Sequence, residues 1–158
     1  MKKVILLPFM CLLIYSCSSN SASNTGTGTA SGTDLKAANG NPSYDPNRGE
    51  GKFMHVDLGT ALDEKMAANG KKIYDIKCGA CHKLTTEKLV GPGWTGVTTR
   101  HSPEWIMNFV TNTDIMLNKD PKAQAMLELC MVRMPNQNLS DDDARALLEF
   151  MRQNDGVK

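Results

Sequence analysis

The sequence lacks a membrane-length apolar run, a strand pattern, an internal repeat and an excess of one charge. Its apolar run in residues 4–15 is too short for a transmembrane helix, which needs about 20 such residues. The formal net charge of +1 gives no basis for nucleic acid as a partner. These absences leave a helical chain whose function has to be sought in its motifs.

The chain also lacks a disulfide framework, because its five cysteines do not supply an even set of partners. Cys11 lies in the apolar run and Cys17 follows it, while Cys78 and Cys81 stand close together, which leaves Cys130 over. An odd cysteine of this kind excludes an even set of structural disulfides. We interpret Cys130 as a small buried apolar side chain, and the alternative is a redox-sensitive thiol or a substitute ligand.

The N-terminus predicts export. Lys2 and Lys3 precede the apolar run, which is typical of a secretory signal. The stretch Ile14–Cys17 resembles a bacterial lipobox, which implies a lipoprotein signal at residues 1–17 and acyl chains on Cys17. The mature protein would then be lipid-anchored in the bacterial cell envelope with its domain facing the periplasm. An ordinary signal peptide cut between residues 17 and 25 is the alternative.

A polar stretch separates this leader from the rest of the chain. Within residues 18–56, the part up to about residue 50 is rich in Ser, Thr, Asn, Gly and Ala and has almost no large apolar side chains. Such a composition buries too little surface to offset the entropy of ordering, so we predict a disordered tether. The folded domain is expected over residues 57–158, and a buried prosthetic group would help so small a core.

Helix signals recur through this domain and no strand pattern does. Residues 60–63 resemble a capping box, which predicts a helix over residues 61–77. Residues 84–101 read as a long ordered loop. Further helices are expected after the N-cap residues Ser102, Asp120 and Ser140, the first two of which precede a proline. The predicted fold is therefore all-α, with four to five short helices.

The stretch KCGACHK places two cysteines two residues apart and a histidine, His82, directly after the second. A structural zinc site needs four ligands, and the domain offers no second spaced pair. A thioredoxin-like dithiol is expected beside a βαβ unit, for which no strands are available. Two thioether bonds from Cys78 and Cys81 to one haem, with His82 on the iron, agree best with an exported all-α domain.

The domain resembles a class I monohaem c-type cytochrome over about residues 60–154. Four motifs occur in the order of that family: Gly70 with Tyr74, the Cys78–His82 attachment motif, Gly91-Pro92 and Met134-Pro135. The resemblance implies a small cytochrome c fold wrapped around one covalently bound haem c. It also implies that Gly70 and Tyr74 pack the first helix on the last.

The same resemblance implies the residues around the iron. His82 and Met134 would be its axial ligands, and the Pro92 carbonyl would accept a hydrogen bond from the His82 imidazole. Met131 is the rival sixth ligand, with His101 or no sixth ligand as further alternatives. Trp105 and Arg100 would contact the haem propionates. His101 is otherwise expected to be an exposed loop residue, and Trp94 is expected to pack on the haem rather than to anchor a partner.

Two strong axial ligands leave no open position for a substrate, so the resemblance implies a monomeric one-electron carrier and not an enzyme. Its expected partners are a quinol-oxidising complex as donor and a terminal oxidase or reductase as acceptor. The segments around Gly91 and Met134 resemble cytochromes that accompany nitrous oxide reductase. The alternatives are a five-coordinate haem enzyme or gas sensor, and a fixed haem subunit of a respiratory complex.

Basic residues gather around the cysteine motif. They form either a mixed solvated surface or a basic docking face for a partner. The residues concerned are Lys65, Lys71, Lys72, Lys77, Lys83 and Lys88.

Overall fold

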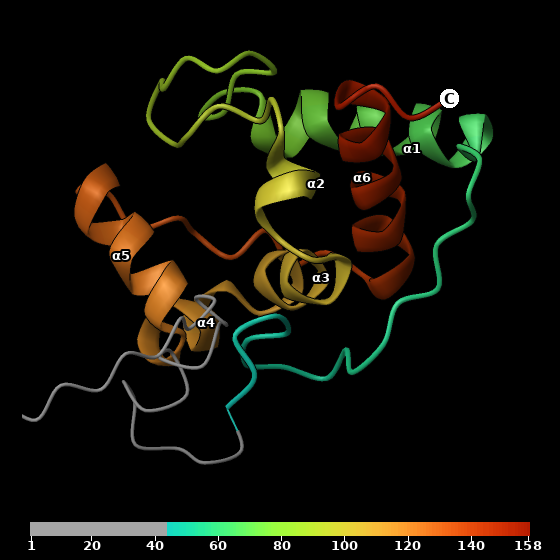
Figure 1. Cartoon of the computed structure of the whole chain (residues 1–158). Coiled ribbons are helices and arrows are strands. Elements are labelled where there is room, and N and C mark those ends of the chain that lie inside the picture. Colours follow the sequence, from blue (N-terminus) through green and yellow to red (C-terminus); the bar gives the residue numbers. More distant parts are fainter. Residues whose placement is uncertain (1–43) are drawn as a thin grey trace, which may run out of the picture. The chain divides into compact units, whose positions relative to one another are not determined.

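The structure is a computed structural model that describes residues 44–158 of the chain. This range contains six α-helices, one π-helical segment and no β-strand, which confirms the predicted all-α class (Figure 1). The elements are α1 (Glu64–Ile73), η2 (Tyr74–Cys78), α2 (Val97–Arg100), α3 (Pro103–Thr111), α4 (Thr113–Lys119), α5 (Pro121–Cys130) and α6 (Asp141–Asn154).

Three helices begin where their N-cap signals predicted. The side chains of Ser102, Asp120 and Ser140 accept hydrogen bonds from backbone N–H groups in the first turns of α3, α5 and α6. Each cap satisfies an amide that has no partner within its helix. Local chemistry therefore sets the starts of these helices.

The first helix begins later than the capping box predicted. Its N-cap is Asp63, whose carboxylate accepts from the Met66 amide at 2.8 Å, so the predicted start at residue 61 is wrong. The Asp63 amide donates to Oε1 of Glu149 in α6 at 3.0 Å. This tertiary bond holds Asp63 outside the helix. At its other end α1 continues directly into η2, which reaches Cys78.

Two short helices, α2 and α4, were not predicted. The α2 helix interrupts the segment 84–101 that was expected to be a loop. The Asp155 carboxylate at the end of α6 accepts from the amides of Gly96 and Thr98 and so holds the start of α2 in place. Because these partners are more than fifty positions apart, no local pattern reveals the bonds.

The helices α1 and α6 cross in close contact (Figure 1). A Cβ atom on Gly70 would lie 2.0 Å from the backbone oxygen of Ala146, so only glycine allows this approach. Tyr74 continues the contact, with its ring centroid 5.5 Å from that of Phe150. The packing expected for Gly70 and Tyr74 is therefore present.

Residues 44–56 pack on the helices. Tyr44 is 1% exposed, and its hydroxyl donates to Oδ2 of Asp120 at 2.6 Å. The Phe53 amide donates to Asn108 in α3 at 2.9 Å. The packed part of the described chain thus begins at Tyr44, and we correct the boundary at residue 57 and the tether over residues 44–56. The prediction of disorder from composition failed for this segment because a few anchoring side chains hold it on the helices.

The other predictions for the N-terminal part lie outside the described residues. They concern the leader at residues 1–17, the lipid on Cys17 and the tether over residues 18–43. Among residues 44–158, no helix has both the length and the apolar character needed to cross a membrane.

Candidate functional site

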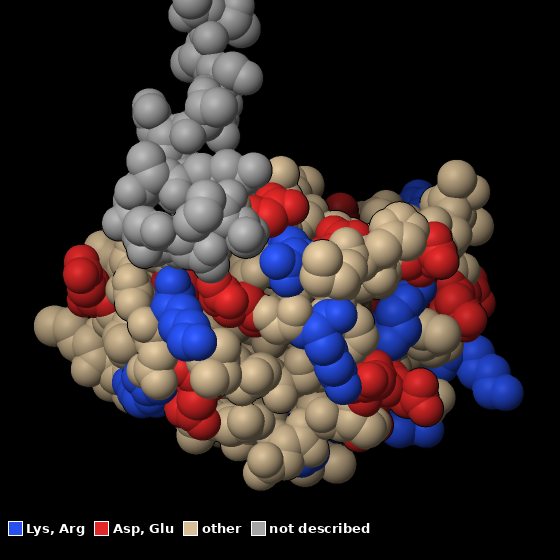
Figure 2. All heavy atoms as spheres, turned by 90° about the horizontal axis from the view of Figure 1, so that it is seen from below, with Lys and Arg blue, Asp and Glu red and all other residues tan. Residues whose placement is uncertain are grey.

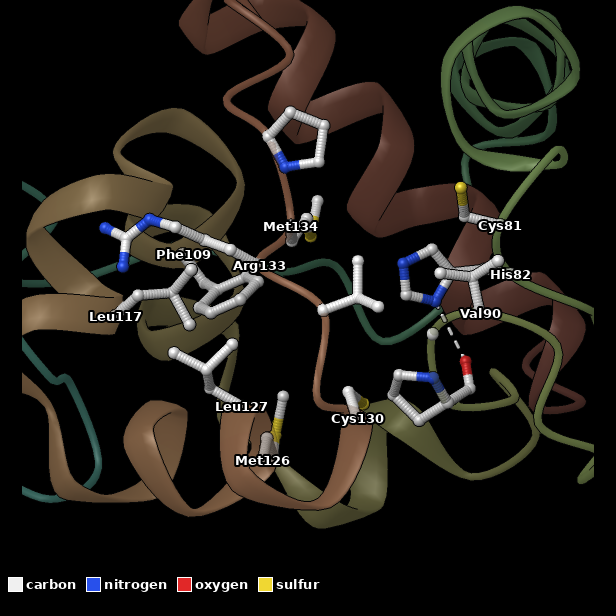
Figure 3. A pocket seen from close by; sticks show the side chains of 14 residues that line it. Cys81, His82, Val90, Phe109, Leu117, Met126, Leu127, Cys130, Arg133 and Met134 are labelled. Carbon is white, nitrogen blue, oxygen red and sulfur yellow. Dashed lines mark hydrogen bonds between the residues drawn. The ribbon is translucent and has the colours of Figure 1, made fainter.

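Three adjoining hollows meet between η2, α3, α5 and the loop that precedes α6. Their volumes are about 570, 1100 and 440 Å³, and His82 and Met134 line all three. The other lining side chains are mostly apolar. Figure 3 shows the first hollow, with His82 and Met134 contributed by separate segments of the chain. A largely apolar group larger than a single side chain would fit here.

The imidazole of His82 is held in one orientation. Its Nδ1 lies 2.9 Å from the carbonyl oxygen of Pro92. Because a carbonyl only accepts, Nδ1–H donates and Nε2 keeps a free lone pair. Burial lowers the pKa of His82, and the Pro92 carbonyl partly opposes this effect. The Pro92 contact predicted from the sequence is present, and the neutral ring is suited to bind a metal.

Neighbouring side chains leave His82 little room to move. A Cβ on Gly91 would lie 2.2 Å from Cε1 of the imidazole. The Tyr74 hydroxyl donates to the His82 carbonyl at 2.5 Å. The buried Trp94 ring lies 5.8 Å from the imidazole and 4.9 Å from the Tyr74 ring, between centroids. Trp94 thus lines the hollow and offers no exposed ring to a partner.

The thiols of Cys78 and Cys81 lie beside the same ring. Both residues line the hollow of about 440 Å³ with His82, and neither forms a disulfide. Cys78 is buried, which raises the pKa of its thiol to about 11, whereas Cys81 is exposed. Residues 44–158 contain no group of three His, Cys, Asp or Glu side chains placed to hold a metal ion. The zinc alternative therefore finds no ligand set in the described part.

The structure separates the two candidate methionines. Met131 ends α5 with a left-handed backbone (φ 60°), is 84% exposed and lines none of the three hollows. Met134 lies in the loop that follows and lines all of them. Of the two, only Met134 faces the space beside His82.

Arg100 and Trp105, which were expected to contact the haem propionates, line the same hollow. Arg100 lines the hollow of about 1100 Å³ and donates to the carbonyl oxygens of Gly93, at 3.1 Å, and Thr95. The ring of Trp105 lines the same hollow, but its Nε1–H donates to Oδ1 of Asp120 at 3.1 Å. Because the indole has a single donor and its N–H is already engaged by Asp120, the ring contributes an apolar wall to the hollow.

His101 is a lining residue that the sequence prediction missed. It was expected to be exposed, yet its ring stacks on Trp105 with 4.1 Å between centroids, and it lines the hollow of about 1100 Å³. Its Nδ1 is buried, and no group among residues 44–158 bonds to it. In the sequence, a histidine shortly before a tryptophan is only a weak indication of a lining residue. The fold is needed to show that the two rings stack.

Charges near the motif are mixed. Lys71 pairs with Asp75 and Lys83 with Glu87, each four residues along the chain. The face shown in Figure 2 also carries both positive and negative side chains. The described residues therefore favour a mixed solvated surface over a basic docking face.

An exposed apolar rim borders the first hollow. Lys88 donates to the Leu129 carbonyl at 2.8 Å and so joins the two segments that form the rim. Val90 and Val132 also line the hollow. The exposed residues of the rim are Leu89, Val90, Leu129, Met131 and Val132.

The sequence matches the cytochrome c family over residues 67–155. The chain belongs to the cytochrome c family. Among solved structures, cytochrome c from Rhodothermus marinus is similar, with 33% identity, a TM-score of 0.64, and coverage of 66% of this chain and 90% of that one. An engineered form, Rma TDE, bound to the carbene intermediate 1-ethoxy-1-oxopropan-2-ylidene has 32% identity, a TM-score of 0.61 and the same coverage. No curated protein sequence matches.

As a member of this family, the cytochrome carries covalently bound haem c with its iron and is a haem-based electron carrier. The residues present fit that group. The three apolar hollows share a buried imidazole with a free Nε2, and two thiols lie beside it. The unpartnered Nδ1 of His101 is a further feature that a bound group accounts for.

Proposed function

We propose that this cytochrome is a one-electron carrier in which Cys78 and Cys81 form the thioether bonds and His82 and Met134 are the axial ligands. The observation that carries the proposal is that His82 and Met134, from separate segments, line the same three hollows. The adjacent thiols lie at the edge of one of them. Haem iron, when bound, supplies the ferric/ferrous couple.

The chain's own residues suit it to electron transfer. Pro92 fixes the His82 ring through the bond to Nδ1, which directs Nε2 into the hollow and raises its basicity. The Met134 thioether is a soft, neutral ligand that favours the ferrous state and raises the reduction potential. With both positions filled, no site is left for a substrate on the iron.

In this proposal, electrons pass through the apolar rim. The partner that docks on the rim is an electron-transfer protein with an uncharged contact surface. The support is its position, because Val90 and Val132 belong both to the rim and to the lining of the first hollow. The nearby Lys83 and Lys88 are engaged by Glu87 and by the Leu129 carbonyl. Contacts of this kind are small and transient in electron-transfer complexes.

The proposed donor is a quinol-oxidising complex, and the proposed acceptor is a terminal oxidase or reductase, with nitrous oxide reductase as the specific candidate. The support for these partners is the sequence resemblance of the segments around Gly91 and Met134. The proposed location is the periplasmic side of the cell envelope, through lipid on Cys17. Mass spectrometry of the N-terminal peptide of the mature protein tests the lipid, and reoxidation of the reduced protein by candidate reductases tests the acceptor.

A visible and near-infrared spectrum tests the central proposal, recorded on the haem-loaded protein before and after addition of carbon monoxide. We expect a reduced c-type spectrum, a weak sulfur-to-iron band in the oxidised state and no response to carbon monoxide. Rapid binding of carbon monoxide without the sulfur band would instead favour a five-coordinate enzyme or gas sensor. Purification in a stable stoichiometric complex would favour a fixed respiratory subunit.

A further inference from the structure

The carboxylates of bound haem need partners, and the charged or titratable side chains that line the largest of the three hollows are all basic. Arg100, His101 and Lys122 line this hollow of about 1100 Å³. No Asp or Glu is among its lining residues. A largely apolar hollow with basic groups and no acidic one is suited to a group with an apolar body and anionic ends.

His101 has the clearest need for such a ligand. Its Nδ1 is buried and is the sole buried side-chain nitrogen or oxygen in residues 44–158 without a hydrogen-bond partner. Leaving a buried polar group unpaired costs about 1–3 kcal/mol, so a partner is expected when the site is filled. Stacking on Trp105 fixes the ring, at 4.1 Å between centroids and 17° between planes.

The groups around His101 make its charge sensitive to a bound anion. Burial, and then the positive charges of Lys122 and Arg100, lower the pKa of His101 to about 4, while Asp120 opposes them. The Asp120 carboxylate is itself engaged by Tyr44, Trp105 and the Ala123 amide. A carboxylate placed against Nδ1 would favour the protonated ring and raise the pKa of His101.

We infer that His101 is a positioning residue that donates Nδ1–H to a haem propionate and couples electron uptake to proton uptake. A bound haem that supplied the ferric/ferrous couple would make the site one positive charge lower in the reduced state, so the His101 ring would hold a proton taken from water more tightly in that state. The coupling is reciprocal, and the reduction potential therefore falls as pH rises through the range in which His101 titrates. This inference rests on the proposed ligation by His82 and Met134.

The test is the reduction potential of the haem-loaded protein as a function of pH in wild type, His101→Gln and His55→Gln. Glutamine still donates a hydrogen bond but does not titrate. His55 is the matched control because its side chain is 75% exposed, pairs with Asp57 and does not line the hollow. We expect the potential to fall with rising pH in wild type and His55→Gln, and to lose that dependence in His101→Gln.

A second measurement avoids any variant. The ring resonances of His101 in the wild-type protein, followed by NMR against pH, should titrate at higher pH in the reduced state than in the oxidised state. Equal titration in both states, or an unchanged pH dependence of the potential in His101→Gln, would overturn the inference. The sulfur-to-iron band in the same samples reports separately on Met134, so failure of the proposed ligation is distinguishable from failure of the His101 role.

Discussion

The backbone of Gly91 lies directly against the imidazole of His82, where an added Cβ would be 2.2 Å from Cε1 and 2.6 Å from Nδ1. The next residue, Pro92, supplies the carbonyl that binds that same Nδ1. One tight loop therefore both limits the position of the ring and sets its tautomer. Any side chain at residue 91 has to displace the proposed iron ligand or the loop.

We expect Gly91→Ala to lower the yield of haem-loaded protein and to reduce the free energy of unfolding by about 1–3 kcal/mol, the usual cost of an overpacked site. Haem content and chemical denaturation measure the two effects. Gly79→Ala is the control, because its added Cβ would meet the Tyr74 ring at an ordinary 3.4 Å. Equal losses in both variants would contradict the steric explanation.

Met134→Ala should lower the reduction potential by a substantial part of the roughly 0.8 V over which axial ligands tune haem potentials. It should also allow carbon monoxide to bind, because the variant leaves one iron position without its ligand. Potentiometry and carbon monoxide difference spectra give both results. The exposed Met131, changed to Ala, should leave both properties as in wild type. The reverse pattern would make Met131 the ligand.

Gly70→Ala should destabilise the contact between α1 and α6. Its Cβ would lie 2.0 Å from the Ala146 oxygen and 2.8 Å from Cβ of Phe150, so backbone atoms would have to move. We expect the free energy of unfolding to fall by about 1–3 kcal/mol in denaturant titrations. Asn69→Ala, on the exposed side of α1, is the control and should change stability little. Wild-type stability in Gly70→Ala would show that the helices can separate freely.

Tyr44→Phe should reduce the free energy of unfolding by about 1.5–3 kcal/mol, the typical value for a hydrogen bond to a charged group. The lost bond is the one from the Tyr44 hydroxyl to the buried Asp120, which also accepts from Trp105 and caps α5. A chain beginning at Asp57 should be less stable than one beginning at Tyr44. Equal stability of these two chains would show that residues 44–56 do not stabilise the domain and belong to the tether.

Met131→Lys should slow reoxidation by the acceptor protein several-fold, because it places a charge on the apolar rim. Reoxidation by a small uncharged oxidant should be unchanged, since the haem site is not altered. Met54→Lys is the control, because Met54 is exposed and lies in the segment before α1 rather than on the rim. Stopped-flow spectroscopy follows both reactions, and sedimentation checks whether the rim instead pairs two copies of the chain. Equal slowing by Met54→Lys would contradict the assignment of the rim.

Several features of this protein could be predicted from short stretches of sequence, because the interacting groups are only a few residues apart. The caps Ser102, Asp120 and Ser140 act on amides three residues away, so three helix starts were predictable. The spacing of Cys78, Cys81 and His82 likewise brings two thiols and an imidazole together within about one helical turn. Family membership, the all-α class and the covalent haem followed from these short-range patterns.

Tertiary structure decided what depends on partners far apart in the chain. The start of α1 depends on Glu149, the start of α2 on Asp155, and the packing of residues 44–56 on Asp120 and Asn108. The indole N–H of Trp105 is engaged by Asp120, and the fold buries Nδ1 of His101. Sequence by itself determined which groups can bind haem, because bonding capacity belongs to the residue. Only the fold decided which of them face the hollow, because burial and competing partners come from distant segments.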